Sequence, residues 1–174
     1  VNIFNNILFI FPQISPQKIL KIFLLYIIIF TNIVLWDYKM FELIYVSTAA
    51  KRMTKDNLQS ILMESMRHNS DHNITGILLY DQGSFCQVLE GDKKDVLSLF
   101  KKIKKDKRHF NVITISEKDI QYREFSAWSM RFINLDFYDR EMIQGYQTIS
   151  GNRMNWTEIN ASLAKNILMQ FKSI

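Results

Sequence analysis

The sequence predicts an α+β fold in which a sheet containing antiparallel strands carries two helices on one face. Short runs rich in β-branched and aromatic residues alternate with two segments of helical periodicity. A turn signal joins two of these runs into a hairpin. The composition, 48% hydrophobic and 22% charged over 174 residues, suits one sizeable core. The order β-α-β-β-α-β-β is that of a ferredoxin-like sandwich with one extra strand.

The first 39 residues differ in composition from the rest of the chain. Both prolines lie here, and residues 22–36 (IFLLYIIIFTNIVLW) are nearly all apolar. Counted from Ile19, the apolar run is near the lower limit of the roughly 17–25 residues of a membrane span. A signal peptide is a second interpretation, although no convincing cleavage site follows. A third, which we favour, is an over-extended start, since Val1 is the first residue and Met40 directly precedes the first predicted strand.

The first strand and the first helix follow. Residues 41–47 (FELIYVS) are dominated by strand-forming residues and predict a strand. Residues 54–69 predict a helix with Thr54 as its N-cap. We expect this helix to end near Asn69, where the polar run NSDHN begins. Its apolar stripe at helical spacing consists of Leu58, Ile61, Leu62 and Met66.

A hairpin and a second helix come next. Residues 74–80 (ITGILLY) and 84–90 (SFCQVLE) are predicted strands, and the tripeptide DQG between them is typical of a hairpin turn. Gly91 and Asp92 open a helix that is expected to run to about residue 105. Its apolar positions fall at i, i+3, i+4 and i+7 and are Val96, Leu99, Phe100 and Ile103.

Two strands and two helices complete the predicted order. Residues 110–116 (FNVITIS) and 128–135 (WSMRFINL) are expected to be strands. Residues 140–149 and 157–171 are expected to be amphipathic helices that either cover the other face of the sheet or pair between subunits. The predicted organisation is an apolar N-terminal segment (1–39), a domain (40–135) and a C-terminal helical extension (136–174).

The common catalytic motifs are absent from the sequence. It has no glycine-rich phosphate loop, no Gly-x-Ser-x-Gly and no metal-spaced Cys/His cluster, so we expect no enzyme activity and no metal. His68 and His72 are four residues apart, but the expected helix end separates them. Cys86 is the single cysteine and cannot form an intramolecular disulfide. A cytoplasmic location therefore fits best, with membrane anchoring only if the N-terminal segment is a genuine anchor.

The formal net charge of +5 has its visible excess in residues 101–109 (KKIKKDKRH). Lysines at the end of a helix complement its dipole and point to solvent. No interleaved aromatic residues or nucleic-acid motif accompany them. We therefore expect no nucleic-acid partner.

Three polar residues occupy positions on apolar faces of predicted elements. Tyr45 alternates with Phe41 and Leu43, and Gln87 alternates with Phe85 and Leu89. Asn69 lies eleven residues after Leu58, three helical turns on. Each has an ordinary explanation in a surface-reaching hydroxyl, a helix cap or a bond to backbone. Together, a phenol and two amides facing one cleft would recognise the edge of a flat heteroaromatic ligand.

The region from Phe41 to about Phe132 resembles the BLUF domain, a flavin-binding blue-light sensor. The matching segments are LIYVS, RHNSDHNITGILLYDQGSFCQVLEG, KDKRHFNV and FSAWSMRF, which cover roughly ninety residues in the family's order. The resemblance, to the short stand-alone members, implies a ferredoxin-like fold, FAD as the chromophore, and a photoreceptor rather than an enzyme.

The resemblance also implies roles for particular residues. The family's photoactive tyrosine and glutamine fall on Tyr45 and Gln87, and the tryptophan and methionine near them on Trp128 and Met130. An altered hydrogen-bond network through Tyr45 and Gln87 would be relayed to the C-terminal helices and to a protein partner that the sequence does not name. The residues expected around the flavin are Tyr45, Ile61, His68, Asn69, Gln87, Ile103, Arg108, His109 and Met130.

A rival interpretation is a flavin-free ferredoxin-like module for interaction or ligand binding, possibly tethered to a membrane, in which Asn69 and Gln87 satisfy backbone groups. The combination of these amides with Tyr45 and the tripeptide WSM favours the photoreceptor. Apolar C-terminal helices on a small domain also lead us to expect a homo-oligomer. A membrane partner is expected only if residues 1–39 belong to the natural protein.

Overall fold

A computed structural model describes residues 15–36, 40–139, 142–144, 148–149, 153–154 and 159–172. The chain divides into two units, Val1–Tyr38 and Lys39–Ile174. In the first unit, helix α2 spans Pro16–Trp36 and contains the apolar run that the sequence marks as a marginal membrane span. Across the described residues, no helix combines the length and apolar character needed to cross a membrane.

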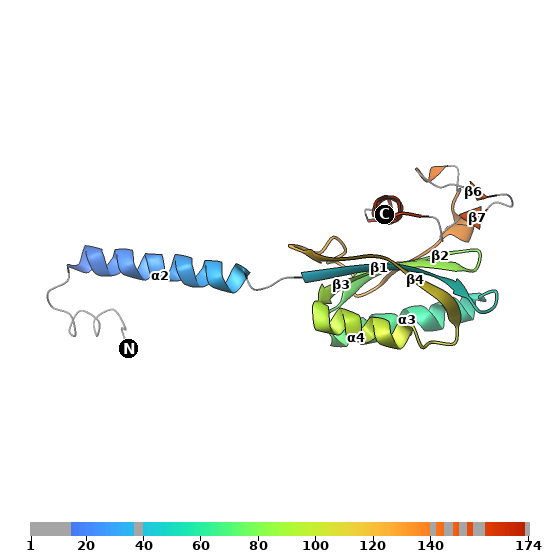
Figure 1. Cartoon of the computed structure of the whole chain (residues 1–174), viewed down its shortest axis with the longest axis horizontal. Coiled ribbons are helices and arrows are strands. Elements are labelled where there is room, and N and C mark those ends of the chain that lie inside the picture. Colours follow the sequence, from blue (N-terminus) through green and yellow to red (C-terminus); the bar gives the residue numbers. More distant parts are fainter. Residues whose placement is uncertain are drawn as a thin grey trace. The chain divides into compact units, whose positions relative to one another are not determined.

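The second unit is built on a five-stranded sheet (Figure 1). Its strand order is β4-β1-β3-β2-β5. All neighbouring strands are antiparallel except β2 and β5, which run parallel. This arrangement confirms the ferredoxin-like sandwich, with β5 as the extra strand at one edge. The strands are β1 (Met40–Ala49), β2 (Thr75–Asp81), β3 (Ser84–Asp92), β4 (His109–Ile120) and β5 (Arg131–Asn134).

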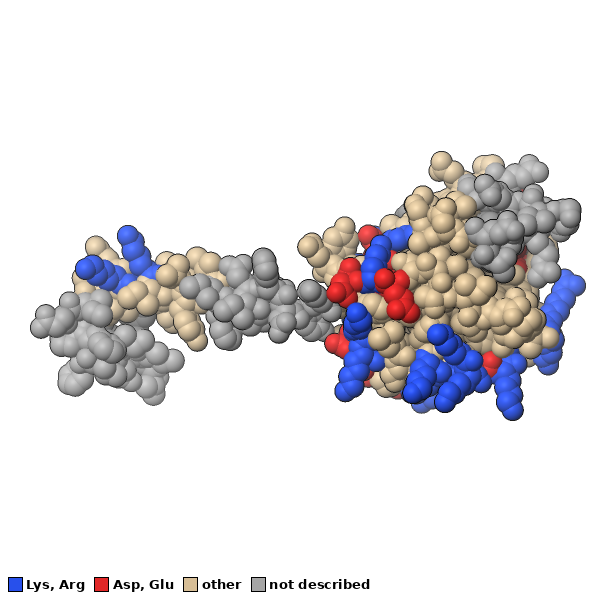
Figure 2. Space-filling view, in the orientation of Figure 1, with Lys and Arg blue, Asp and Glu red and all other residues tan. Residues whose placement is uncertain are grey.

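Helices α3 (Lys55–Asp71) and α4 (Lys93–Ile103) lie together on one face of the sheet (Figure 1). Thr54 caps α3 as predicted, because its hydroxyl accepts from the backbone N–H of Asn57 while the Asn57 side chain accepts from Thr54 N–H. Asp92 caps α4 with a single hydrogen bond, in which its carboxylate accepts from Lys94 N–H. Lys and Arg side chains gather on the side of the domain where these helices lie (Figure 2).

The alternation of side chains along the strands divides the core into two layers. On the helix face, Leu43, Leu78 and Leu89 belong to a buried cluster with apolar residues of α3 and α4. On the other face, Ile44 and Val88 pack with residues of the C-terminal helix α5 (Ala161–Met169). The C-terminal helix therefore covers the second face of the sheet, one of the two arrangements expected for this region.

The hairpin between β2 and β3 uses the predicted turn. Gln82 and Gly83 have φ values of 44° and 90°. A two-residue turn with positive φ at both positions matches the twist of the adjoining strands, which is why DQG is a strong hairpin signal. The pairing that follows places Leu78 opposite Gln87 and Leu79 opposite Cys86.

Several element boundaries differ from the sequence-based expectation. Helix α3 continues to Asp71, because His72 N–H bonds to the carbonyls of Asn69 and Ser70 and closes the last turn. The imidazoles of His68 and His72 consequently stack, with ring centroids 4.2 Å apart. The expectation that the helix end separates these histidines was wrong. Strand β4 extends to Ile120, well beyond the predicted residue 116.

The C-terminal region also differs from expectation. Residues 140–141 and 145–147 of the expected helix 140–149 lie outside the described residues, and its last two residues form a short strand, β6 (Thr148–Ile149). This strand pairs with β7 (Arg153–Met154). The β-branched Thr148 and Ile149, followed in sequence by Ser-Gly-Asn, favour a hairpin over a helix. Helix α5 is shorter than the expected 157–171, and a 3₁₀ turn, η1 (Leu135–Phe137), follows β5.

Candidate functional site

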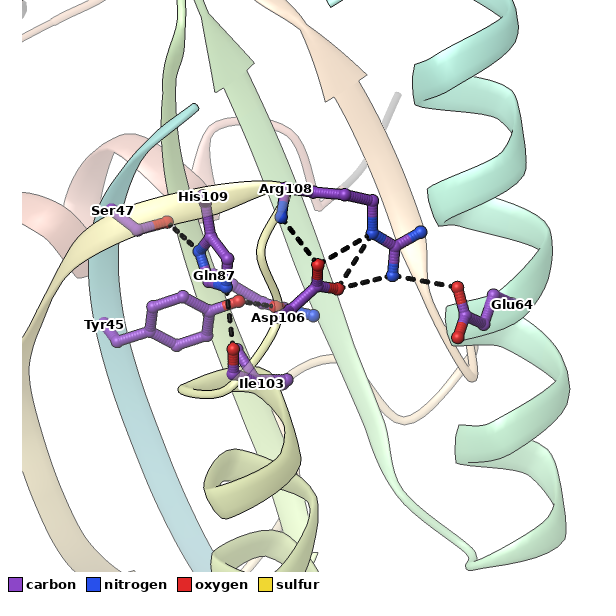
Figure 3. Close-up of polar contacts among 8 residues, drawn as sticks. All are labelled: Tyr45, Ser47, Glu64, Gln87, Ile103, Asp106, Arg108 and His109. Carbon is purple, nitrogen blue, oxygen red and sulfur yellow. Dashed lines mark hydrogen bonds and ion pairs between the residues drawn. The ribbon is translucent and has the colours of Figure 1, made fainter. Parts of the chain in front are cut away.

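Tyr45 and Gln87 meet on the helix face of the sheet. They stand directly opposite each other in the β1–β3 register, and both are buried, with 4% of each residue exposed. The Tyr45 hydroxyl donates a hydrogen bond to Gln87 Oε1 (Figure 3). Burial raises the pKa of Tyr45 above its ordinary value, so the phenol is protonated at neutral pH.

The other end of the Gln87 amide points to Met130. Gln87 Nε2 donates to Met130 Sδ at 3.4 Å. The amide therefore lies between a phenol donor and a thioether acceptor, which fixes Oε1 toward Tyr45 and Nε2 toward the sulfur. Met130 is buried and directly precedes β5, so this contact joins the centre of the sheet to its extra strand.

Asn69 ties helix α3 to the same segment. It is 1% exposed near the helix C-terminus, and its Nδ2 donates to the carbonyl of Ser129 at 2.7 Å. Its remaining amide hydrogen and its carbonyl oxygen are the groups that could meet a ligand. Asn69 and Gln87 thus contact adjacent residues, Ser129 and Met130.

His109 and Arg108 form the polar end of the site, at the start of β4 (Figure 3). His109 Nε2 donates to the carbonyl of Ile103 at 2.8 Å, and its Nδ1 lies 2.8 Å from Ser47 Oγ. The Arg108 guanidinium contacts both carboxylate oxygens of Asp106 and lies 2.9 Å from Glu64 Oε2. This ion pair joins the segment after α4 to helix α3.

These ionic contacts set the charge state of Asp106 and Arg108. Burial raises the pKa of Asp106, but hydrogen bonds from Arg108 outweigh it, so the pKa lies below the ordinary value. The hydrogen bond to Asp106 holds the pKa of Arg108 above its ordinary value. Both groups are therefore charged at neutral pH.

A cavity of about 220 Å³ opens between α3, α4 and the sheet. Leu78, Phe85 and Leu99 give it apolar walls. An apolar slot with amides at its inner end suits a flat heteroaromatic ligand. Of the residues expected around the flavin, the structure brings eight to this cavity: Tyr45, Ile61, His68, Asn69, Gln87, Ile103, Arg108 and His109. Met130 reaches it through its contact with Gln87.

Trp128 does not line this cavity and does not lie beside Tyr45 and Gln87. Its ring packs against the buried cluster on the opposite face of the sheet, and the Arg131 guanidinium lies 4.6 Å from the ring centroid. Cys86 also belongs to that opposite cluster and is fully buried. It therefore does not pack beside the Gln87 side chain, because adjacent residues of a strand point to opposite faces.

Besides the three apolar wall residues, five polar or charged residues line the cavity and were not expected from the sequence. Glu64 and Ser65 lie one helical turn from both Ile61 and His68, a spacing that could have indicated them. Arg67 and Lys102 are neighbours of expected residues in the sequence, but no periodicity marks them. The five are Glu64, Ser65, Arg67, Lys102 and Asp106. Within the described residues, no group of three His, Cys, Asp or Glu side chains is placed to hold a metal.

Comparison with known proteins gives a consistent result. Residues 40–131 match the family model "BLUF: Sensors of blue-light using FAD". The chain is 38% identical over 95 residues to photoactivated adenylate cyclase subunit beta of Euglena longa, covering 54% of this chain and 11% of that protein. The chain thus spans about a tenth of the length of the curated relatives it matches.

Solved structures give the same picture. The ground state of BlsA superposes with a TM-score of 0.66 at 28% identity, covering 78% of this chain and 89% of that one. A bacterial light-regulated adenylyl cyclase gives a TM-score of 0.58 at 40% identity, covering 60% of this chain and 31% of that one. The dark-state structure of BlrB, a BLUF protein, gives 0.55 at 29% identity, covering 62% and 78%.

Proposed function

The chain belongs to the BLUF family of blue-light sensors, and from this premise we propose that it binds FAD non-covalently in the α3–α4 cavity and uses Tyr45 and Gln87 as its light-driven switch. The observation that carries the proposal is the buried hydrogen-bonded chain from Tyr45 through Gln87 to Met130, adjoining the cavity. A phenol that donates to an amide beside a ligand cavity can pass a proton toward a bound ligand, which a pair with a purely structural role would not need to do.

The residues around the cavity fit a flavin ring. Ile61 and Ile103, from the two helices, line the cavity and would hold the ring faces. Asn69 and Gln87 provide donors and acceptors for the carbonyls and nitrogens of the ring edge. His68 Nδ1 is buried and, among the described residues, has no hydrogen-bond partner. A polar ligand would satisfy that nitrogen.

The bound flavin would supply the absorption of blue light and, when excited, an electron acceptor. Tyr45 is placed to be the donor, because its phenol is neutral and its proton already lies on the path to Gln87. With a flavin bound, Tyr45 would act as a reversible donor of one electron and one proton and would recover both. The phenol would then be unchanged, and the lasting difference would be the orientation or tautomer of the Gln87 amide.

Rotation of that amide would change its contact with Met130. Exchange of Oε1 and Nε2 would place the amide N–H at the Tyr45 oxygen and the amide carbonyl at the Met130 sulfur. A thioether is only a weak acceptor and cannot donate, so the Gln87–Met130 hydrogen bond would be lost. Because Met130 directly precedes β5, loss of its hydrogen bond to Gln87 would first change the position of Met130 and of the start of β5.

The output would pass from β5 to the C-terminal region and to a protein partner. The relatives include photoactivated adenylate cyclases, and we propose that residues 40–174 regulate an effector and do not themselves catalyse a reaction. Helix α5 covers the sheet face opposite the cavity, which makes it the element best placed to present a changed surface. A second copy of the chain is also a proposed partner.

Reconstitution with FAD tests the proposal. The purified full chain, mixed with FAD and desalted, should retain flavin absorption in the visible range. A chain that remains colourless after this treatment, although folded by circular dichroism, would refute flavin binding and leave the flavin-free module as the better account.

A further inference from the structure

Two buried carboxylates lie opposite each other on the sheet face that α5 covers. Glu42 in β1 and Glu90 in β3 are partners in the register of these strands, and both are fully buried. Each stands two residues from a member of the cluster that packs on α5, Ile44 in one strand and Val88 in the other. Burial of a charged carboxylate is costly unless it is paired, and the proposed switch uses neither side chain.

Glu90 holds the segment between β4 and β5 through backbone groups. Its Oε1 accepts from the N–H of Glu124 and its Oε2 from the N–H of Phe125, each at 2.9 Å. The Thr75 hydroxyl, from β2, donates to Oε2 at 3.4 Å. An ionised carboxylate accepts on both oxygens, so the charged form makes both backbone hydrogen bonds at once. Protonation would turn one oxygen into a donor and weaken one of these bonds.

The segment that Glu90 holds leads to the switch. Residues 124–130 run from the two bound N–H groups to Met130, whose sulfur accepts from the Gln87 amide. Phe125 belongs to the cluster on the α5 side of the sheet, whereas Met130 belongs to the cluster on the α3–α4 side. The segment therefore connects a buried carboxylate on one face of the sheet to the hydrogen-bonded chain on the other.

Charged groups from the neighbouring elements lie around this carboxylate. They are Glu42 of β1, Lys118 of β4 and Lys165 of α5, which both pair with Glu42, and the Glu124–Lys172 pair. Burial raises the pKa of Glu90 above its ordinary value, and the charge of Glu42 raises it further. The backbone hydrogen bonds and the charge of Lys165 act in the opposite direction but leave the pKa raised. The charge on Glu90 therefore depends on pH and, through Lys165, on helix α5.

We propose that Glu90 is a positioning residue of the switch, which holds Met130 against Gln87 through the backbone that it binds. Its ionised form favours the return of the illuminated protein to the dark state. Recovery requires the Met130 sulfur to accept from the Gln87 amide again, and two hydrogen bonds to the segment restrict Met130 to the place where it can do so. The inference rests on the proposed function and adds to it a residue on the opposite face of the sheet.

The recovery rate of the FAD-loaded full chain after illumination, measured between about pH 5 and 8, tests this. Wild-type recovery should slow by about fivefold as pH falls, the factor expected when one hydrogen bond is weakened. The change should be centred above the ordinary glutamate pKa of about 4.3, because burial raises that of Glu90. Glu90→Gln should recover slowly at every pH, since its amide nitrogen cannot accept one of the two backbone hydrogen bonds.

Glu117→Gln is the matched control. Glu117 is an exposed carboxylate of β4 that pairs in register with Leu43, on the α3–α4 side of the sheet. This variant should keep the wild-type pH profile. Recovery that is independent of pH in the wild type, or pH dependence that persists in Glu90→Gln, would overturn the inference. A chain that binds FAD without any light-induced change would refute the proposed function itself.

Lys165→Met tests the link to α5 while leaving Glu90 in place. Loss of the Lys165 charge removes a contribution that lowers the pKa of Glu90, so the midpoint of the recovery profile should move to higher pH. Lys172→Met, which removes the partner of Glu124 near the surface, should leave the midpoint unchanged. An unmoved midpoint in Lys165→Met would contradict the link. This variant also decides the question if Glu90→Gln fails to fold.

Hydrogen–deuterium exchange in the flavin-free full chain measures the hold on the segment without any light response. Peptides that contain residues 124–125 should exchange at least about fivefold faster in Glu90→Gln than in the wild type at neutral pH. In Glu117→Gln they should exchange at the wild-type rate. Equal exchange of this segment in Glu90→Gln and the wild type would show that Glu90 does not hold it, which would overturn the inference whatever the flavin measurements give.

Discussion

At the scale of single residues, the site depends on one side-chain amide with two different neighbours. Gln87 accepts from a phenol and donates to a thioether. Both contacts are buried, so replacing either neighbour leaves half of the amide without its partner, at a cost of about 1–3 kcal/mol. These two contacts therefore fix the orientation of this amide in the structure, and removal of the Tyr45 proton would remove one of them.

Tyr45→Phe tests the role of the phenol. This variant should still bind flavin but lose the reversible light response, and its free energy of unfolding should fall by about 1–3 kcal/mol because Gln87 Oε1 loses its donor. Tyr80→Phe is the control, because Tyr80 is a buried tyrosine of the same cluster whose hydroxyl instead accepts from Met53 N–H. Flash photolysis and chemical denaturation measure the two effects. A normal light response in Tyr45→Phe would contradict the assignment.

The sequence was sufficient to place the three polar residues, because each follows from a fixed period. Alternation along β1 and β3 puts Tyr45 and Gln87 on the helix face, and helical spacing from Leu58 buries Asn69. The face on which Trp128 lies could not be predicted from such a period. It lies before β5, where the backbone is not a regular strand, so alternation does not determine its face. Lys102 and Arg67 approach the cavity only through the packing of two helices.

At the scale of elements, the segment between β4 and β5 connects the cavity to the rest of the domain. It is held on one side by Asn69, through the Ser129 carbonyl. On the other, Glu90 accepts from the backbone N–H groups of Glu124 and Phe125, each at 2.9 Å. Burial raises the pKa of Glu90, which these bonds only partly offset. A buried carboxylate thus anchors the segment at a cost in stability.

Comparison of the wild type with Glu90→Gln at several pH values should reveal how much the buried Glu90 carboxylate lowers the free energy of unfolding. A carboxyl group with a raised folded-state pKa destabilises the protein at neutral pH, and this effect diminishes as pH falls through the folded-state pKa. The wild type should therefore gain stability relative to Glu90→Gln as pH is lowered from about 8 toward the unfolded value of about 4.3. Denaturant unfolding of both proteins across this range measures the difference. A difference independent of pH would show that Glu90 has no shifted pKa.

Two ion pairs of different burial hold the C-terminal region: one joins helix α5 to strand β1, and the other joins the residues after α5 to the segment between β4 and β5. Lys165 pairs with Glu42, which is fully buried and also pairs with Lys118 at 3.2 Å. Lys172, in contrast, pairs with Glu124 near the surface. Removing the partner of a buried charge is costly, whereas an exposed pair contributes little.

Two lysine variants compare these pairs. Lys165→Met should lower the free energy of unfolding by about 1–3 kcal/mol, less than for a carboxylate left alone because Lys118 remains. Lys172→Met should change it by less than about 1 kcal/mol. Thermal or chemical denaturation gives both values. Equal effects of the two variants would mean that Glu42 does not hold α5.

At the scale of the whole molecule, the second unit has three layers, with α3 and α4 on one face of the sheet and α5 on the other. The element order predicted the sheet and the first helix layer. It did not predict the β6–β7 hairpin, because amphipathic spacing in residues 140–149 outweighed the turn signal that follows. Because helices cover both faces of the sheet, the cavity and α5 lie on opposite sides of it, and the strands connect them.

The proposed boundary at Met40 predicts that the second unit is independent. A protein of residues 40–174 should unfold at the same denaturant concentration as the full chain and bind FAD with the same affinity. Loss of either property would show that residues 1–39 contribute to the folded domain. The full chain, purified in parallel, is the reference.

The most direct test of the central claim is the light-minus-dark absorption spectrum of the FAD-loaded full chain, recorded beside that of Gln87→Leu. A switch at Gln87 predicts a small, reversible red shift of the flavin bands in the wild type, because the hydrogen bonds to the flavin change while the flavin itself does not. The Gln87→Leu protein should bind FAD and show no such shift. The same reversible shift in Gln87→Leu would contradict the account.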